Sequence, residues 1–261
     1  MSRVAIHPTA VVSPKAHLAP DVKIGPYAVV EGPCEIGPGV ELGPHVVIHP
    51  YVRLLAGVKV GPHSVLGGIP QDLSFKGQET GLEVGENTVL REGVILHRST
   101  KEEAPTRIGA GCYLMGYVHV GHDSQVGDGV ILTQSVAVAG HVEIGPCAVV
   151  GGLAGIHQFV RIGTRAMIGG LSKVTRDVLP FTLADGSPAL HYRLNTVGLR
   201  RAGINGERYR ALEQAFRAVR EGRPLEGLSD TEEVQTLKAF LAGPSRRSLS
   251  GFVRGEPDFE G

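Results

Sequence analysis

An aliphatic residue recurs at every sixth position of this chain, and this period constrains the fold more than any other feature. Of the 29 positions from 6 to 174 that are multiples of six, 26 hold Ile, Leu or Val. The exceptions fall in two polar stretches, IPQDLSFKGQETG and STKEEAPT, after which the same phase resumes. A period of six matches neither a helix nor a simple alternating strand. It is typical of short strands joined by tight turns, each turn bringing one aliphatic side chain to a central axis.

A triangular coil follows from this period. Three hexads complete one turn of the coil, and successive turns stack as parallel strands about 4.8 Å apart. We therefore expect a mainly β chain whose parallel β-helix covers residues 1–187, with the two polar stretches ejected as loops at about 67–82 and 99–107.

Helical periodicity replaces the hexads after Pro180, in a C-terminal helical domain expected over residues 188–261. A first helix should end at Gly222 and bury one face, formed by Tyr209, Leu212, Phe216 and Val219. A second should begin at Ser229 or Asp230 and bury Val234, Leu237 and Leu241. The stretch from Pro244 is expected to be loosely ordered.

Bulk properties exclude several classes of protein. The chain has 26 basic and 26 acidic residues, so its net charge predicts neither nucleic-acid nor membrane-surface binding. No apolar run long enough to span a bilayer and no signal peptide are present, so we expect no membrane span. Three cysteines, Cys34, Cys112 and Cys147, cannot all pair, which favours a reducing, cytoplasmic location.

The three-hexad coil predicts which polar residues share an edge. The hexads run unbroken from Ile108 to Val174, so residues three hexads apart in this stretch should lie directly above one another. His122 then lies beneath Gly140, and Asp123 beneath His141. The edge also collects His119, Gln158, Lys173 and Arg176. Such a cluster, beside a glycine that leaves open space, indicates a site.

The residue types in this cluster suit acyl transfer. A histidine that titrates near neutrality can take a proton from a hydroxyl, and a neighbouring carboxylate such as Asp123 can orient it. A backbone N–H at a glycine can stabilise an oxyanion. No reactive Ser or Cys accompanies the cluster, which favours direct transfer over a covalent acyl-enzyme.

Other interpretations of the histidines remain. Single histidines on turns are usually solvated, and we expect this of His7, His17, His45, His49 and His63, whereas His97 is undecided. Clustered histidines also bind zinc. The trimeric γ-class carbonic anhydrases place three zinc-binding histidines on such a coil, but at a different spacing and from both sides of a subunit interface. We therefore expect no metal here. A purely structural repeat protein would not need the cluster.

The runs HVGHD, AGHVEIG, GGLAGIHQF and PQDL resemble the UDP-N-acetylglucosamine O-acyltransferase family of lipid A synthesis, along nearly the whole chain. The resemblance implies a left-handed coil, a homotrimer with sites between subunits, and no cofactor beyond the phosphopantetheine of acyl carrier protein. The implied reaction moves a (3R)-3-hydroxyacyl group from that carrier to the 3-hydroxyl of UDP-N-acetylglucosamine. A 3-amino sugar nucleotide as acceptor, and the later N-acyltransferase of the pathway, remain alternatives.

The same resemblance implies residue roles. His122 corresponds to the catalytic base, Asp123 to its orienting partner and the N–H of Gly140 to the oxyanion donor. The positions that hold the sugar nucleotide are Asp72, Ser74, His119, His141, His157, Gln158, Asn195 and Arg201. Ser74 stands where many relatives have Lys, and Val197 where some have Glu. Asp72 lies in the first loop, which would reach toward a neighbouring subunit. Gly170 matches the position that limits acyl length.

A basic docking surface is expected for the acidic acyl carrier protein. Four basic residues lie a few coils above the histidines, a distance of about 14 Å that a phosphopantetheine arm can cover: Arg161, Arg165, Lys173 and Arg176.

Overall fold

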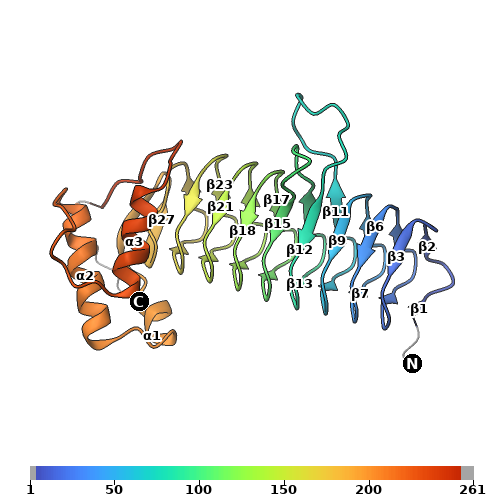
Figure 1. Cartoon of the computed structure of the whole chain (residues 1–261), viewed down its shortest axis with the longest axis horizontal. Helices are drawn as coiled ribbons and strands as arrows, with labels where there is room; N and C mark the ends of the chain where they lie inside the picture. Colours follow the sequence, from blue (N-terminus) through green and yellow to red (C-terminus); the bar gives the residue numbers. More distant parts are fainter. Residues whose placement is uncertain (1–3, 254–261) are drawn as a thin grey trace.

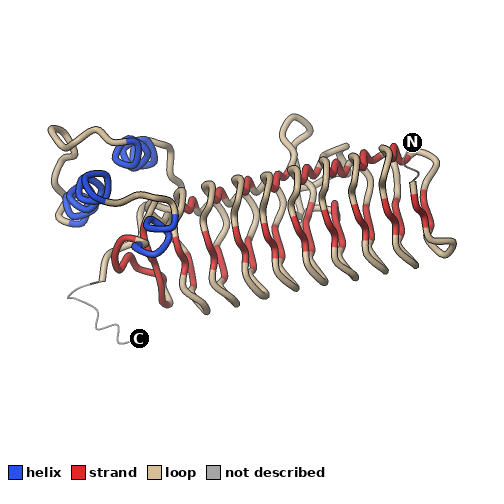
Figure 2. Tube along the Cα trace, turned by 90° about the horizontal axis from the view of Figure 1, so that it is seen from below, coloured by secondary structure: helices blue, strands red, loops and turns tan. Residues whose placement is uncertain are grey.

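The computed structural model describes residues 4–253, which form a long three-sided β-helix with helices at its C-terminal end (Figure 1). Residues 1–3 and 254–261, which the expected domains include, lie outside the described residues. Strands pair with strands of the turns before and after, so each side of the coil is one sheet (Figure 2). We call these sheets A, B and C, in the order in which the chain visits them.

Each sheet takes every third strand. Sheet A contains β1 (Ala5–Ile6), β4 (Lys23–Ile24), β7 (Glu41–Leu42), β10 (Lys59–Val60), β13 (Val89–Leu90), β16 (Tyr113–Leu114), β19 (Ile131–Leu132), β22 (Val149–Val150), β25 (Met167–Ile168), β27 (Thr182–Gly186) and β28 (Ala189–Leu194). Sheet B contains β2 (Val11–Val12), β5 (Val29–Val30), β8 (Val47–Ile48), β11 (Val65–Gly68), β14 (Ile95–His97), β17 (His119–Val120), β20 (Ala137–Val138), β23 (Gly155–Ile156) and β26 (Lys173–Val174). Sheet C contains β3 (Ala16–Leu18), β6 (Cys34–Ile36), β9 (Val52–Leu54), β12 (Leu82–Val84), β15 (Thr106–Ile108), β18 (Gln125–Val126), β21 (Glu143–Ile144) and β24 (Arg161–Ile162).

The sixfold period reflects burial along the axis of the coil. In a typical hexad, the residue at the multiple of six and the residue two before it both point inward: Leu132 and Val130 are each 0% exposed. Cys34 and Cys112 occupy the inner small position and are free thiols. Each short strand thus adds two apolar side chains to one continuous core.

The strand register explains why the sixfold pattern continues in the same phase after both loops. Uninterrupted strands pair at a separation of three hexads, as in Gln125↔Glu143. Val65 pairs with Ile95, five hexads further along the chain, and Ile95 pairs with His119, four hexads further along. The first interruption therefore adds two whole hexads and the second adds one, so neither changes the phase. The loops themselves span residues 69–81 and 98–105.

Three corners join the sheets, and the corner from sheet B to sheet C, the BC corner, collects the irregular segments. Both loops leave the coil there, and the longer one projects far from it in Figure 1. The AB and CA corners carry only tight turns over the same stretch of chain.

The coil ends in an antiparallel hairpin, β27–β28. The expected boundary between residues 187 and 188 falls in its turn, so residues 189–194 belong to sheet A and not to the helical part. Three helices follow: α1 (Thr196–Arg201), α2 (Gly206–Arg220) and α3 (Glu232–Ala242). They pack around a second core whose buried members include Phe181, Leu212, Phe216, Val234 and Leu237.

Several expectations about the tail are wrong. Thr231, and not Ser229 or Asp230, caps α3, because its side chain accepts a hydrogen bond from the Val234 N–H. Leu241 is 38% exposed, since α3 packs through a narrower apolar stripe. The stretch from Pro244 is not loose over its described part: Ser250 N–H donates to the Asp177 carbonyl at 2.9 Å, and Asp177 N–H to that of Ser248 at 2.9 Å. Within residues 4–253, no helix is long and apolar enough to cross a membrane.

Candidate active site

His122 lies at the BC corner, immediately after β17, and Gly140 covers it one coil above. A β-carbon built on Gly140 would come within 2.7 Å of Nε2 of the imidazole, so only glycine leaves the ring its place. The His122 side chain is 12% exposed. The stacking predicted from the three-hexad coil is therefore present, and it brings a backbone segment without a side chain directly over one ring nitrogen.

Asp123 holds the other ring nitrogen. Its Oδ2 lies 2.6 Å from Nδ1 of His122, and its side chain is only 6% exposed. Thr100, in the second loop, donates to the same carboxylate from its N–H at 3.1 Å and its Oγ1 at 2.9 Å. Burial raises the pKa of Asp123, but the hydrogen bonds from His122 and Thr100 outweigh it and the net pKa lies below the usual value. A charged Asp123 thus keeps a proton on Nδ1 and leaves Nε2 as the acceptor.

Thr100 was not predicted from the sequence. It lies in the polar stretch STKEEAPT, whose only signal was that it interrupts the hexads. Thr106 was also missed: its Oγ1 lies 2.8 Å from the Asp123 N–H, which donates to it. Thr100 of the second loop therefore orients the carboxylate, and Thr106, the first residue of β15, holds the main chain of Asp123.

His141 lies above Asp123, as the coil predicts, and belongs to a column of rings. Its Nε2 is 3.7 Å from Oδ2 of Asp123, and its ring meets that of His122 edge-on at 5.1 Å. Phe159, one coil higher, stacks on His141 at 4.7 Å, and the Arg246 guanidinium covers Phe159 at 4.7 Å. Burial lowers the pKa of His141, which favours the neutral ring.

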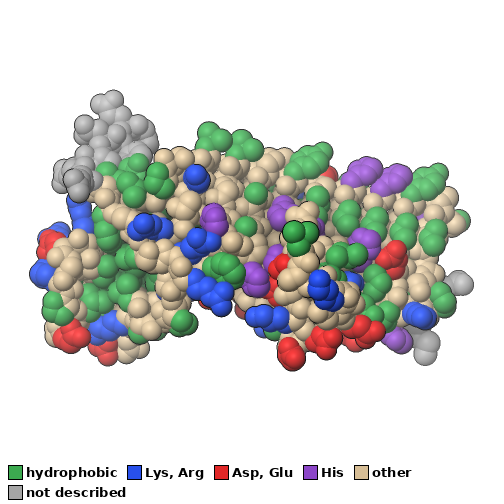
Figure 3. All heavy atoms as spheres, turned by 90° about the horizontal axis from the view of Figure 1, so that it is seen from above, with side chains coloured by type: hydrophobic (Ala, Val, Ile, Leu, Met, Phe, Trp, Pro, Cys, Tyr) green, Lys and Arg blue, Asp and Glu red, His purple; other side chains and the backbone are tan. Residues whose placement is uncertain are grey.

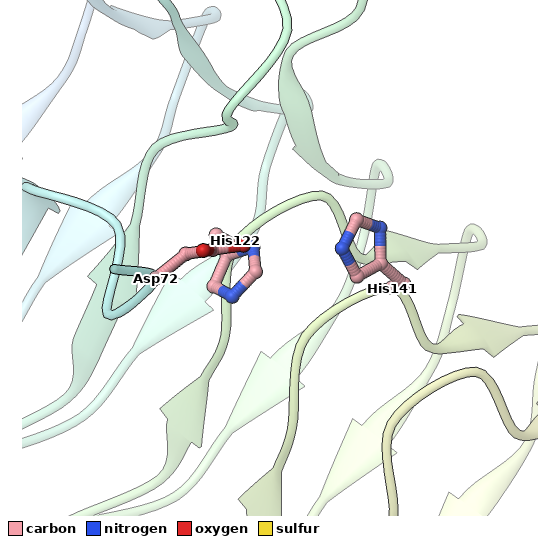
Figure 4. Close-up of side chains that lie close together, drawn as sticks. All are labelled: Asp72, His122 and His141. Atoms are coloured by element: carbon pink, nitrogen blue, oxygen red, sulfur yellow. The ribbon is translucent and has the colours of Figure 1, made fainter. Parts of the chain in front are cut away.

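Asp72 folds back over its own chain (Figure 4). Its carboxylate and one nitrogen each of His122 and His141 lie within 4.8 Å of one another. Ser74 holds Asp72 from its N–H at 2.8 Å and its Oγ at 2.7 Å, and these bonds lower the pKa of Asp72. In the single chain the first loop thus places Asp72 beside its own His122, where the sequence predicted a reach toward a neighbour.

A cavity of about 520 Å³ opens beside His122 on the face of sheet B. Two of its imidazole nitrogens, Nδ1 of His97 and Nε2 of His119, are buried and have no hydrogen-bond partner among the described residues. His97, undecided from the sequence, is 7% exposed, and burial lowers its pKa to about 4. Burial also lowers the pKa of His119. Burial therefore favours the neutral form of both rings, and each keeps one nitrogen without a hydrogen-bond partner among the described residues.

The exposed side chains of His157 and Gln158 line the same cavity. Arg247, from the C-terminal segment, donates from Nε to the Gln158 carbonyl at 2.8 Å. Arg246 and Arg247 were missed because they lie in a stretch without periodicity, 89 residues beyond Gln158 in the case of Arg247.

Asn195 and Arg201 lie at a different corner of the chain. Asn195 caps α1, with Oδ1 accepting from the Gly198 N–H at 3.0 Å, and its Nδ2 donates to the carbonyl of Arg165 at 3.0 Å. Arg165 lies in the turn from β24 to β25, which is the CA corner. A single chain therefore does not bring Asn195, Arg201 or Arg165 to His122.

Gly170 occupies the AB corner, at the opposite edge of sheet B from His122. A β-carbon at this position would approach the Gly152 carbonyl oxygen to 3.3 Å, so glycine leaves space that a side chain would fill. The face of sheet B thus runs from His122 to Gly170.

The expected docking residues divide into two kinds. Lys173 and Arg176 are exposed, and Lys173 lines the cavity. Arg161, by contrast, is engaged within the chain. Its Nε lies 2.9 Å from Oδ2 of the buried Asp177, its Nη2 donates to the Phe240 carbonyl at 3.1 Å, and its guanidinium covers the Phe240 ring. Arg161 joins the coil to α3.

Basic side chains nevertheless gather near this corner. Figure 3, which looks down on the projecting loop, shows Lys and Arg side chains between the histidines and the helical end of the molecule. The C-terminal segment contributes Arg246 and Arg247 where the sequence predicted Arg161.

Two family models match the chain. Residues 177–256 match domain 2 of UDP-N-acetylglucosamine O-acyltransferase, and residues 15–50 match the bacterial transferase hexapeptide of six repeats. A curated acyl-[acyl-carrier-protein]–UDP-N-acetylglucosamine O-acyltransferase of Sulfurihydrogenibium sp. is 56% identical over 253 residues, with 93% of each chain covered. That of Saccharophagus degradans is 40% identical, with 95% of this chain and 99% of that protein covered.

Solved structures agree. The UDP-N-acetylglucosamine O-acyltransferase of Moraxella catarrhalis superimposes with a TM-score of 0.84 at 33% identity, over 94% of this chain and 99% of that one. The Francisella novicida UDP-N-acetylglucosamine acyltransferase gives 0.87 at 27% identity, over 94% of each chain. The predicted left-handed parallel β-helix with C-terminal helices is confirmed. This chain belongs to the UDP-N-acetylglucosamine O-acyltransferase family.

Proposed function

We propose that this enzyme transfers a (3R)-3-hydroxyacyl group from acyl carrier protein to the 3-hydroxyl of UDP-N-acetylglucosamine, the first step of lipid A biosynthesis. The observation that carries the chemistry is the position of His122: Asp123 holds Nδ1 at 2.6 Å, and Nε2 faces Gly140. The homology to acyl-carrier-dependent O-acyltransferases supplies the substrates.

The proposed reaction is direct. Nε2 of His122 takes the proton of the sugar 3-hydroxyl while its oxygen attacks the thioester carbon. The oxyanion of the tetrahedral intermediate accepts a hydrogen bond from the Gly140 N–H, which has no acceptor among the backbone hydrogen bonds of the described residues. The imidazolium, stabilised by Asp123, then protonates the departing sulfur of the phosphopantetheine. General-base catalysis contributes about 10²–10⁴-fold, and no further cofactor is needed.

A homotrimer is part of this proposal, and the three faces of the coil support it. The outward residues of sheet C form a ladder of charge, in which Arg53 lies 3.1 Å from Glu35 and 3.3 Å from Glu83. Sheet B instead presents an apolar row, with Val11 63% and Ile95 40% exposed. The AB corner between the two remaining faces exposes Tyr117, Leu153 and Leu171, each by more than 60%.

The AB corner is apolar and lies between sheets A and B, which are less charged than sheet C. We therefore place this corner on the threefold axis of the trimer and turn sheet C to water. Face A of one subunit then lies against face B of the next. That packing brings the CA corner, with Asn195 and Arg201, toward the sheet B cavity of a neighbouring subunit. The site is then complete only between subunits.

Acyl carrier protein is the proposed donor partner, with Lys173 and Arg176 as the exposed basic residues that meet it. A cytoplasmic location is also proposed. All three cysteines are free thiols, which suits a reducing compartment.

One assay tests the function. The enzyme is incubated, with a chelator present, with hydroxyacyl carrier proteins of increasing chain length and either UDP-N-acetylglucosamine or its 3-amino analogue, and products are identified by mass. We expect O-acylated UDP-N-acetylglucosamine. Product from the amino analogue alone would assign an N-acyltransferase. Absence of acyl transfer, with CO₂ hydration lost on chelation, would assign a zinc hydratase.

A further inference from the structure

Two imidazoles and one carboxylate converge at the BC corner with the composition of a transition-metal site. Asp72, His122 and His141 each offer a ligand atom, and the three atoms lie within 4.8 Å of one another. Figure 4 shows the three side chains approaching from two adjacent coils and the first loop. Two histidines with one carboxylate and open positions form a common ligand set for divalent first-row metals.

Metal binding requires the three ligand atoms to move closer together. Ligand atoms on a tetrahedral zinc, at about 2.0–2.2 Å from the ion, are about 3.4 Å apart. The three ligand atoms, which lie within 4.8 Å of one another, must therefore approach by up to about 1.4 Å. Asp72 can supply this movement, because it lies on the irregular loop 69–81, outside the sheets. His122 and His141 are held by the coil and by each other's rings.

Asp123 contacts both histidines of this cluster. It binds Nδ1 of His122 and lies 3.7 Å from Nε2 of His141. Metal-binding histidines usually donate their second ring nitrogen to a carboxylate, which orients the ring and makes it a stronger ligand. The contact that prepares His122 as a base therefore prepares it equally as a metal ligand.

We propose that Asp72, His122 and His141 bind a divalent transition-metal ion, with Zn²⁺ favoured over Mg²⁺, and that the bound ion inhibits the enzyme. Imidazole ligands suit Zn²⁺, whereas Mg²⁺ requires near-octahedral oxygen coordination. Inhibition follows whichever nitrogen of His122 the ion takes. Through Nε2 it occupies the lone pair that accepts the proton, and through Nδ1 it displaces Asp123. The inhibitory part rests on the proposed function, whereas the binding part does not.

Calorimetric titration of the full-length protein with Zn²⁺, in metal-free buffer, tests the binding. We expect one equivalent per chain. Asp72→Asn and His141→Gln should each weaken binding at least tenfold, while Asp72→Glu, which retains a carboxylate, should preserve most of it. The matched control is His17→Gln, which removes an exposed imidazole on sheet C, the face that the proposed trimer turns to water, and should leave binding unchanged.

Two results would overturn the site. One is Zn²⁺ binding that is unaffected by Asp72→Asn and His141→Gln, and the other is binding that disappears in His17→Gln. Co²⁺ should give the intense visible absorption of a four-coordinate ion, lost in Asp72→Asn. In the acyl-transfer assay, Zn²⁺ should inhibit competitively with UDP-N-acetylglucosamine and be reversed by chelator. Noncompetitive inhibition would refute the proposed block. Because calorimetry needs no turnover, failure of the metal site and failure of the acyltransferase function give different results.

Discussion

Arg247 donates from Nε to the main-chain carbonyl of Gln158 at 2.8 Å, across 89 residues of sequence. The contact joins the C-terminal segment to the turn that lies one coil above Gly140, at the rim of the sheet B cavity. Arg246, beside it, covers the Phe159 ring that stacks on His141. The C-terminal segment therefore supports the site from its outer side.

Replacing Arg247 should weaken binding of the nucleotide sugar more than it slows catalysis. Arg247→Ala removes a charged hydrogen bond of about 2 kcal/mol that positions Gln158, so we expect KM for UDP-N-acetylglucosamine to rise about tenfold with kcat within about threefold. Steady-state kinetics measures both. Arg223→Ala is the control, because Arg223 pairs with the nearby Glu221 in the helical tail. An unchanged KM would show that Arg247 has no positioning role.

Adding one methyl group over His122 should inactivate the enzyme without unfolding it. The β-carbon of Gly140→Ala would meet Nε2 at 2.7 Å, so the ring must move, and a displacement near 1 Å costs on the order of 100-fold in kcat. Gly116→Ala is the control, since its β-carbon meets the movable Gln134 side chain at 3.2 Å. If the two variants had equal activity and equal thermal stability, the β-carbon at position 140 would not displace His122.

Asp123 should act through the tautomer of His122. Asp123→Asn should lower kcat by on the order of 10³–10⁴, because the amide no longer keeps the proton on Nδ1. Thr100→Val removes a single hydroxyl donor to Asp123 and should have a much smaller effect, about tenfold or less. Nitrogen-15 NMR of the imidazole reports the tautomer. Wild-type protonation at Nε2 at neutral pH would argue against this role.

Stability should fall as the pH is lowered from about 6.5 to 4. Burial lowers the pKa of His97 and of His191 to about 4, whereas a free histidine titrates near 6.5. The unfolded chain therefore binds more protons in this window, and the free energy of unfolding decreases on acidification, by at most about 3 kcal/mol for each ring. Urea unfolding of His97→Gln at pH 7 and 4.5 should show a smaller loss than wild type. His17 is exposed, so His17→Gln should lose as much free energy of unfolding as wild type. An equal loss in both variants would show that burial of His97 does not cause the pH dependence.

Arg161 should affect stability and Arg176 should affect the carrier. Arg161→Ala leaves Asp177, 2% exposed at its side chain, without its partner, so we expect a loss of about 3 kcal/mol in the free energy of unfolding. Arg176 is exposed, and Arg176→Glu should raise KM for acyl carrier protein several-fold while the melting temperature stays constant. The reverse pattern, with Arg161→Ala stable but defective toward the carrier, would restore Arg161 to the docking surface.

Periodicity alone placed His122 beneath Gly140 and Asp123 beneath His141, because nothing interrupts the coil between Ile108 and Val174 and each turn takes three hexads. Even across the loops the phase was readable, since the first insertion is two whole hexads and the second is one. A stacked coil converts sequence separation directly into position, so its core and its columns follow from local geometry.

The remaining contacts depend on how nonrepeating segments fold back onto the coil. Asp72 beside His122, Thr100 on Asp123 and Arg247 on Gln158 all come from stretches without a period, so their sequence positions do not indicate where their side chains lie. For Arg161, the repeat predicts the wrong surroundings. Its hexad position faces outward, and only the docking of α3 and the buried charge of Asp177 cover it. Packing between distant segments, and not the repeat, decided these contacts.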